Sequence, residues 1–140
     1  MSESVSEHIA IRFVNEINRH DVSALASLMA PDIRFIDERG QELRGCDRVS
    51  EAWTECFHSV PDYRIAIREH LATGQKVALF GTVSGTASSP PDGSRRWISP
   101  AAWRAVISEG RISEWQAYGG QEAREKIPVR TEPPASMRSS

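Results

Sequence analysis

The sequence has few cysteines, no long apolar run and almost no net charge, and each lack excludes a class of protein. The 140 residues include two cysteines, Cys46 and Cys56, which are too few for a disulfide scaffold and do not have metal-ligand spacing. No apolar run approaches the roughly 20 residues of a membrane span. The net charge of −2 gives no electrostatic reason to expect nucleic-acid binding. We therefore expect no metal and no membrane or nucleic-acid partner.

The two ends of the chain carry little apolar sequence. The N-terminus lacks the basic stretch and apolar core of a secretory signal, so we expect a cytoplasmic location. Beyond residue 120, and most clearly from Pro128, the chain is rich in proline, serine and charge and cannot bury enough apolar area to offset its ordering entropy. The length suits one domain. We predict a single domain over residues 1–120 and a polar tail over 121–140.

Apolar residues spaced three or four apart predict three helices in the first half of the chain. The first should run from about residue 5 to 19. Asp21 is placed to cap a second, short helix that Pro31 ends. Asp47 is placed to cap a third helix, which Pro61-Asp62 closes.

Strands follow where the apolar period changes to two. An early strand should span 32–37, between the second and third helices. After the third helix, turns at 73–75 and 108–110 separate strands, including a long one from Trp97 to about Ile107 and a last one from Arg111 to Tyr118. Three helices on one face of a strongly curved antiparallel sheet make an α+β domain.

Six short sequence motifs together resemble those of a known protein family. They are Asn18-Arg19-His20-Asp21, Leu28-Met29-Ala30-Pro31-Asp32, Leu43-Arg44-Gly45, Pro61-Asp62-Tyr63, Gly85-Thr86 and Glu109-Gly110-Arg111-Ile112. In this order they resemble the SnoaL-like branch of the nuclear transport factor 2-like superfamily, over about residues 5–120. That family includes polyketide cyclases, ketosteroid isomerases, epoxide hydrolases and dehydratases, and also non-catalytic binding modules. The resemblance implies a cone-shaped α+β barrel with a deep apolar cavity, no cofactor, and a homodimer formed through the outer sheet face.

The stretch FIDERG, residues 35–40, contains the main candidate residue, Asp37. Side chains two apart in a strand point the same way, so Asp37 shares its side with Ile33 and Phe35. The resemblance places that side in the cavity, where ketosteroid isomerases have their general base. An acid that is partly desolvated in an apolar pocket is a better proton acceptor. Alternatively, Asp37 is the first residue of a type I turn that ends at Gly40.

A base alone leaves a developing enolate without stabilisation. By the resemblance, isomerases carry a tyrosine where this chain has Phe13, and an acid where it has Ala101 or Ala102. The two acids bridged by an arginine in epoxide hydrolases are also absent, since the long strand has no carboxylate. We therefore expect neither of these two activities.

Other candidate site residues come from the aromatic residues and histidines. Phe13, Trp53, Phe57 and Trp115 are predicted to bind the substrate, although a core role for Trp115 stays open; Trp97 and Trp103 would extend the aromatic wall. His58 is a candidate second acid-base group at the cavity rim.

The remaining histidines are interpreted as structural. His8 and His20 lie near the two ends of the first helix, and the end of a helix suits a left-handed cap at His20. His70 shares a strand side with Arg64 and Arg68, so we expect it to face solvent or a partner subunit.

Two functions fit these features. The first is a small-molecule enzyme doing cofactor-independent acid-base chemistry, such as cyclisation, isomerisation or dehydration, on an apolar and possibly cyclic substrate. The second is a non-catalytic ligand-binding or dimerisation module of the same fold.

Overall fold

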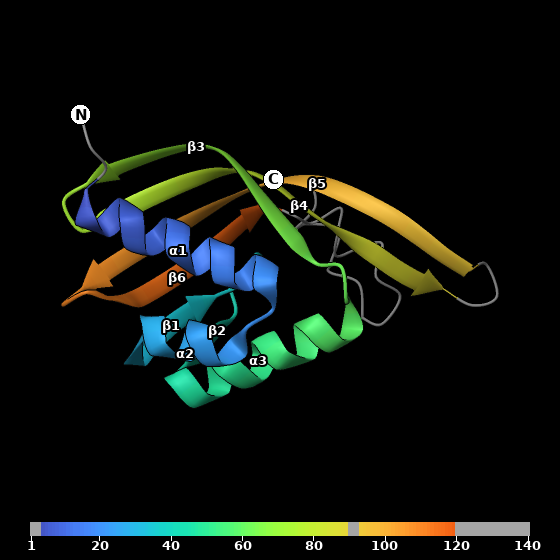
Figure 1. The fold of residues 1–140 in the computed structure, drawn as a ribbon, viewed down its shortest axis with the longest axis horizontal. Coiled ribbons are helices and arrows are strands. Elements are labelled where there is room, and N and C mark those ends of the chain that lie inside the picture. Colours follow the sequence, from blue (N-terminus) through green and yellow to red (C-terminus); the bar gives the residue numbers. More distant parts are fainter. Residues whose placement is uncertain (1–3, 90–92, 120–140) are drawn as a thin grey trace.

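Three helices pack on a curved six-stranded sheet in the computed structural model, which describes residues 4–89 and 93–119 (Figure 1). The helices are α1 (Val5–Arg19), α2 (Val22–Leu28) and α3 (Cys46–Ser59). The strands are β1 (Met29–Ile36), β2 (Glu42–Arg44), β3 (Arg64–Thr73), β4 (Lys76–Ser89), β5 (Gly93–Ser108) and β6 (Arg111–Gly119). The α+β prediction is confirmed. None of the described helices is long and apolar enough to span a membrane. The predicted tail, residues 121–140, lies outside the described residues.

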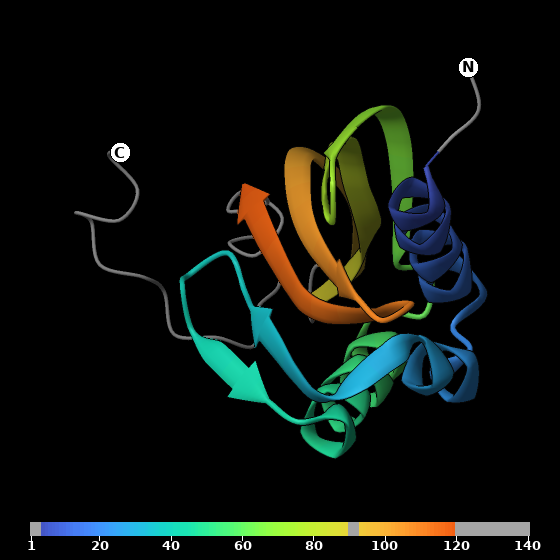
Figure 2. The same cartoon turned by 90° about the vertical axis from the view of Figure 1, so that its left-hand side faces the viewer.

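The strand order is β2-β1-β6-β5-β4-β3, and the sheet is strongly curved (Figure 2). All neighbouring pairs are antiparallel except β1 and β6, which run parallel with Phe35 opposite Trp115. The sheet is therefore mixed, and the prediction of a purely antiparallel sheet was wrong at this pair. Local periodicity could not reveal it, because the two strands lie at opposite ends of the chain. Helix α1 packs across β3 to β6, and α3 packs against β1 and β2.

The helix starts follow local capping chemistry. Ser4 and Glu7 form a reciprocal capping box at the start of α1, whose limits match the predicted 5–19. Asp21 caps α2 as predicted, since its Oδ1 accepts a hydrogen bond from the backbone N–H of Ala24 at 3.0 Å. The prediction for Asp47 was wrong, because Gly45 at φ 101° is the N-cap of α3 and Asp47 lies in its first turn.

Three strands also differ from the sequence prediction. Helix α2 ends at Leu28 and Pro31 lies inside β1, because the chain pairs with β6 from Met29 onward. Strand β5 begins at Gly93, before the predicted Trp97, because its pairing with β4 extends to Ser89 and Gly93. The three-residue strand β2 was not predicted.

A β-bulge reverses the predicted direction of His70. The register of β3 against β4 shifts between Ile67 and Glu69, and this extra residue turns the following side chains to the other face. His70 therefore points inward, with its Nδ1 2.9 Å from Oε2 of Glu7 on α1. Gly81 allows the close approach of the strands here, because a Cβ atom at this position would lie 1.8 Å from the carbonyl oxygen of Ala66.

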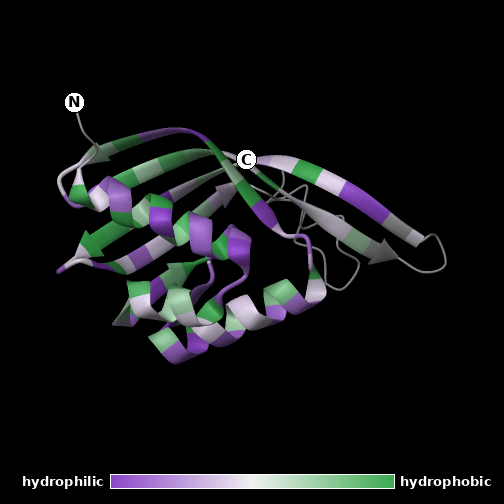
Figure 3. Cartoon of the chain, viewed as in Figure 1, coloured by the Kyte–Doolittle hydropathy of each residue, from purple (hydrophilic) through white to green (hydrophobic). Residues whose placement is uncertain are grey.

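The core lies between the helices and the concave face of the sheet. Apolar and polar residues alternate along β3, β4 and β5 (Figure 3), as expected for strands with one buried face. Phe13 and Ile17 of α1, Ile33 of β1 and Trp115 of β6 are at most 1% exposed. At the end of the sheet near α3 the packing is incomplete, and this leaves a cavity.

Candidate active site

A cavity of about 280 Å³ lies between α3, the turn after β1, and the inner face of β4, β5 and β6. Seven aromatic residues line it: Phe35, Trp53, Tyr63, Trp97, Trp103, Trp115 and, at its edge, Tyr118. The rings pack edge to face, with centroids 5.8 Å apart for Phe35 and Trp53 and 6.0 Å apart for Trp53 and Tyr63. All four tryptophans of the chain thus contribute to one cavity wall.

Asp37 lines this cavity beside Phe35, as strand alternation and the resemblance together predicted. It is also the first residue of a turn. Its Oδ1 accepts hydrogen bonds from the backbone N–H groups of Arg39 and Gln41, both at 2.9 Å, and its carbonyl accepts one from Gly40 N–H at 2.8 Å. Oδ2 has no hydrogen-bond partner among the described residues. The turn therefore fixes the half-buried carboxylate and leaves one oxygen available to a ligand.

The other predicted site residues divide between the cavity wall and the structure behind it. Trp53 and Trp115 line the cavity, whereas Phe13 and Phe57 are absent from its described lining. Phe13 packs against Trp115 with centroids 4.7 Å apart, and Phe57 stacks on Trp53 at 5.5 Å. Phe13 and Phe57 thus support the tryptophans rather than face a ligand.

His58 does not lie with Asp37. Its side chain is exposed and is not among the described lining residues of the cavity. Successive helix residues are about 100° apart, so His58 points well away from Cys56, which does line the cavity. Nothing in this placement brings an imidazole to the Asp37 carboxylate.

Three polar lining residues were not predicted: Glu38, Cys56 and Tyr63. Burial, with a smaller contribution from the charge of Glu38, raises the pKa of Cys56 to about 12. Burial, with smaller contributions from Cys56 and Glu38, also raises the pKa of Tyr63 well above its ordinary value. Both groups are therefore protonated at neutral pH, and Tyr63 retains a hydroxyl that can donate a hydrogen bond.

Sequence signals for these residues are weak. Cys56 follows Trp53 by three residues on the same helix face, and Tyr63 ends one of the six short motifs. Strand alternation would send Glu38 to the face opposite Asp37. Because β1 ends at Ile36, that rule no longer applies at residue 38, and the turn brings both acids to the cavity.

Tyr63 is held in place by the end of α1. His20 caps α1 with φ 58° and its Nε2 lies 2.9 Å from the carbonyl oxygen of Tyr63. The His20 ring also stacks on Phe57 at 4.1 Å. Asn18 bonds both backbone groups of Ile65, each at 2.8 Å. These contacts confirm a structural role for His20 and fix the start of β3 against the helix.

No cluster of three or more His, Cys, Asp or Glu that could hold a metal ion occurs among residues 4–89 and 93–119. In the cavity, the available chemistry is a fixed carboxylate at Asp37, a second acid at Glu38, and a protonated phenol at Tyr63.

Solved structures with the same fold are similar in shape but distant in sequence. A candidate SnoaL-like polyketide cyclase from Shewanella putrefaciens CN-32 superposes with a TM-score of 0.78 at 14% identity, over 92% of this chain and 89% of that one. TerC, co-crystallised with polyporic acid, gives a TM-score of 0.75 at 18% identity, over 89% and 98% of the two chains. A protein with a ketosteroid isomerase-like fold from Catenulispora acidiphila DSM 44928, in complex with trimethylamine, gives 0.75 at 17% identity, over 89% and 97%.

Sequence comparisons give the family. A search of curated proteins found no match. The model of the SnoaL-like domain family matches residues 10–115, a range that includes most of α1, the candidate base and the cavity-lining tryptophans. The chain belongs to the SnoaL-like domain family.

Proposed function

We propose that the chain is a small-molecule enzyme in which Asp37 is the general base for cofactor-independent chemistry on an apolar, possibly cyclic substrate. Cyclisation, isomerisation and dehydration are the reaction types concerned. The observation that carries the proposal is the Asp37 carboxylate in the aromatic cavity, with Oδ1 bound by two backbone N–H groups and Oδ2 unbound. A fixed carboxylate can take a proton from a substrate carbon or hydroxyl without first being reorientated.

Tyr63 supplies the electrophilic partner in this proposal. By the resemblance, isomerases carry hydrogen-bond donors at the positions of Phe13 in α1 and of Ala101 or Ala102 in β5. The side chains present here cannot donate a hydrogen bond to a substrate oxygen. Tyr63, which directly precedes β3, lines the same cavity as Asp37, which directly follows β1, and its raised pKa keeps the hydroxyl protonated. It can therefore donate a hydrogen bond to an oxygen on which negative charge develops. Two proteins of the same fold were crystallised with small molecules, TerC with polyporic acid and the Catenulispora protein with trimethylamine, which supports small-molecule binding by this fold.

Hydrogen–deuterium exchange tests the base directly. Cyclic ketones, 2-tetralone first, are incubated with the protein in D₂O, and exchange at the carbon next to the carbonyl is followed by NMR. Asp37→Asn should lower the catalysed exchange rate by about 100-fold or more, with the melting temperature nearly unchanged because Asn retains the Oδ1 acceptor. Asp62→Asn removes a carboxylate outside the cavity and should leave exchange intact. Undiminished exchange by Asp37→Asn contradicts the proposal.

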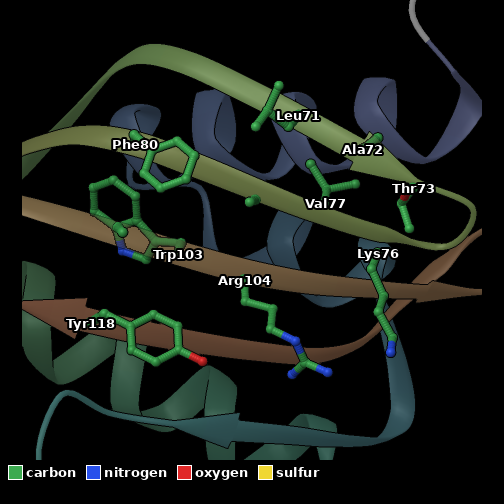
Figure 4. A pocket seen from close by; sticks show the side chains of 11 residues that line it. Leu71, Ala72, Thr73, Lys76, Val77, Phe80, Trp103, Arg104 and Tyr118 are labelled. Atoms are coloured by element: carbon green, nitrogen blue, oxygen red, sulfur yellow. The ribbon is translucent and has the colours of Figure 1, made fainter.

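The second candidate function is dimerisation through the outer sheet face. Of the five large apolar side chains that are exposed in the described residues, four lie on this face: Leu71, Phe80, Ile98 and Tyr118. Three of them border a groove over β3 to β6 (Figure 4). The same face carries both signs of charge, because Glu114 pairs with Arg34 and Arg104.

A second copy of the chain fits this face best, since an apolar strip beside paired charges of both signs can complement itself about a twofold axis. Light scattering should give the mass of two chains. Phe80→Glu should give the mass of one chain, and Val5→Glu, a matched change at the exposed start of α1, should not. A wild-type mass of one chain would exclude this interface.

A further inference from the structure

Among the described residues, the charged groups that line the cavity have one sign. Asp37 and Glu38 line it, and no Lys, Arg or His is found among its described lining residues. The charge of Glu38 acts within the cavity, since it contributes to the raised pKa of both Cys56 and Tyr63. An anionic ligand would meet this charge in a poorly hydrated space, where electrostatic interactions are weakly screened.

The aromatic wall favours the opposite charge. The face of an aromatic ring carries negative electrostatic potential, and indole binds cations most strongly among the aromatic side chains. Trp53, Trp97, Trp103 and Trp115 all line this cavity, together with Phe35 and Tyr63. Carboxylates on one side and aromatic rings around them are complementary to an ammonium group attached to an apolar body.

The size of the cavity limits that body. Its volume of about 280 Å³ lies near the lower end of the usual range for ligand pockets, which begins at about 300 Å³. One or two rings fit such a space.

We propose that this cavity binds an organic cation, a protonated or quaternary amine with a small apolar body, whose ammonium group lies near Asp37 and Glu38 and whose body packs against the tryptophans. The inference rests on the proposed function in taking this cavity as the ligand site, and it narrows the substrate class by charge. It does not depend on which proton Asp37 removes.

Three ligands of matched shape separate charge from apolar packing. They are (3-hydroxyphenyl)trimethylammonium, its neutral carbon isostere 3-tert-butylphenol, and the anion 3-hydroxybenzenesulfonate. Binding can be followed by tryptophan fluorescence, because all four tryptophans line the cavity, and checked by calorimetry. We expect the cation to bind about tenfold or more tightly than the neutral isostere, and the anion most weakly.

Variants locate the source of the preference. Asp37→Asn and Glu38→Gln should each reduce the affinity for the cation by about threefold to tenfold while changing the affinity for 3-tert-butylphenol little. Asp62→Asn, which removes an acid outside the cavity lining, should change neither affinity.

The outcomes distinguish this inference from the proposed function. If the neutral isostere binds as tightly as the cation, or the anion binds most tightly, the charge preference is wrong while the cavity remains a ligand site. A cation preference that persists unchanged in both cavity variants also overturns the inference. If none of the three ligands binds, the cavity is not a site for small molecules, and the inference and the proposed function fail together.

Discussion

Asp37 and Asp62 each lie where a secondary-structure element gives way to a turn, and each accepts a hydrogen bond from a backbone N–H group. They differ in how much of the carboxylate the protein uses. Both oxygens of Asp62 are occupied by Thr86, since Oδ1 accepts from its N–H at 2.9 Å and Oδ2 from its hydroxyl at 2.6 Å. At Asp37 both hydrogen bonds go to Oδ1.

The difference separates an acid that holds the fold together from one that is available for chemistry. Asp62 joins the end of α3 to β4 and is not among the described lining residues of the cavity. Asp37 uses one oxygen for the turn, its other oxygen has no hydrogen-bond partner among the described residues, and the residue lines the cavity. The number of hydrogen bonds that each carboxylate oxygen makes within the protein is thus more informative about its role than the residue type. The same substitutions can be made at both aspartates.

Removing the Asp62 side chain should produce the largest change in stability. Asp62→Ala leaves Thr86 without its partner, and we expect the free energy of unfolding to fall by about 1–2 kcal/mol. The estimate lies toward the low end for a charged acceptor because the Asp62 side chain is 41% exposed. Urea denaturation measures it.

Thr86→Val supplies the matched control for the Asp62 bond. If the two residues act through their shared hydrogen bonds, the double variant should lose clearly less than the sum of the single losses. Additive losses would show that the Asp62–Thr86 contact does not stabilise the fold. Ligand affinity in the cavity should be unchanged throughout this series.

Two substitutions at Asp37 should have different and smaller effects on stability. Asp37→Ala removes the acceptor of the Arg39 and Gln41 N–H groups, so we expect a loss of about 1 kcal/mol. Asp37→Asn keeps an oxygen in the same place and should lose little. Denaturation curves that coincide for these two variants would show that the turn does not depend on Oδ1, and the contrast with Asp62 would then disappear.

The pH dependence of stability should distinguish Asp62 from an unbound acid. Hydrogen bonds from Thr86, and more weakly the charge of Arg96, lower the pKa of Asp62 below its ordinary value of 3.8. A carboxyl group whose pKa is lower in the folded state stabilises the fold above its unfolded-state pKa, and this contribution is lost as pH falls through the folded-state pKa. Asp62→Asn should therefore give a shallower loss of stability below about pH 5.

The contribution of Glu42 to the loss of stability at low pH must be measured separately from that of Asp62. Hydrogen bonds from Arg34 and Arg44 lower its pKa to about 2, so it contributes to the same acid limb with the same sign. Glu42→Gln provides the comparison, and the double variant should be shallower than either single one. An acid limb of unchanged slope in Asp62→Asn would mean that Thr86 does not perturb the carboxyl group.

Much of the fold could be predicted because local sequence patterns encode it. Several of the six short motifs also contain residues that make contacts between elements. Asn18 and His20 from the first motif bind the backbone at Ile65 and Tyr63. The motifs containing Asp62 and Thr86 meet in one pair of hydrogen bonds. Gly85, which belongs to the motif Gly85-Thr86, has no room for a side chain, since a Cβ atom there would lie 2.5 Å from Cγ1 of Val60. These motifs therefore reflect contacts that pack the helices and strands together, and they carry no information about a reaction.

What could not be predicted depends on pairing between distant strands. The parallel β1–β6 pair is set by tertiary packing, and the bulge after Ile67 reverses His70 with no local signal. The site follows the same rule. Trp53 lies on a regular helix face and Trp115 on a regular strand face, and Asp37 is the first residue after β1; periodicity together with the resemblance pointed to these three. Glu38 lies one residue further into the turn, where its direction departs from the alternation of the strand.

The reactivity of Cys56 reports how well the cavity beside Asp37 excludes water. The substitution that tests it has the smallest expected effect of the series. The Cys56 thiol, with a pKa of about 12, holds very little thiolate at pH 8, so its alkylation by iodoacetamide should be slower than in the unfolded chain by about 100-fold or more. Because burial is the larger cause and the Glu38 charge the smaller, Glu38→Gln should speed the reaction only a few-fold. Cys46→Ser isolates the signal of Cys56. A rate equal to that of the urea-unfolded chain would show that water fills the space around Cys56, so that the cavity beside Asp37 is as open to solvent as the surroundings of Asp62.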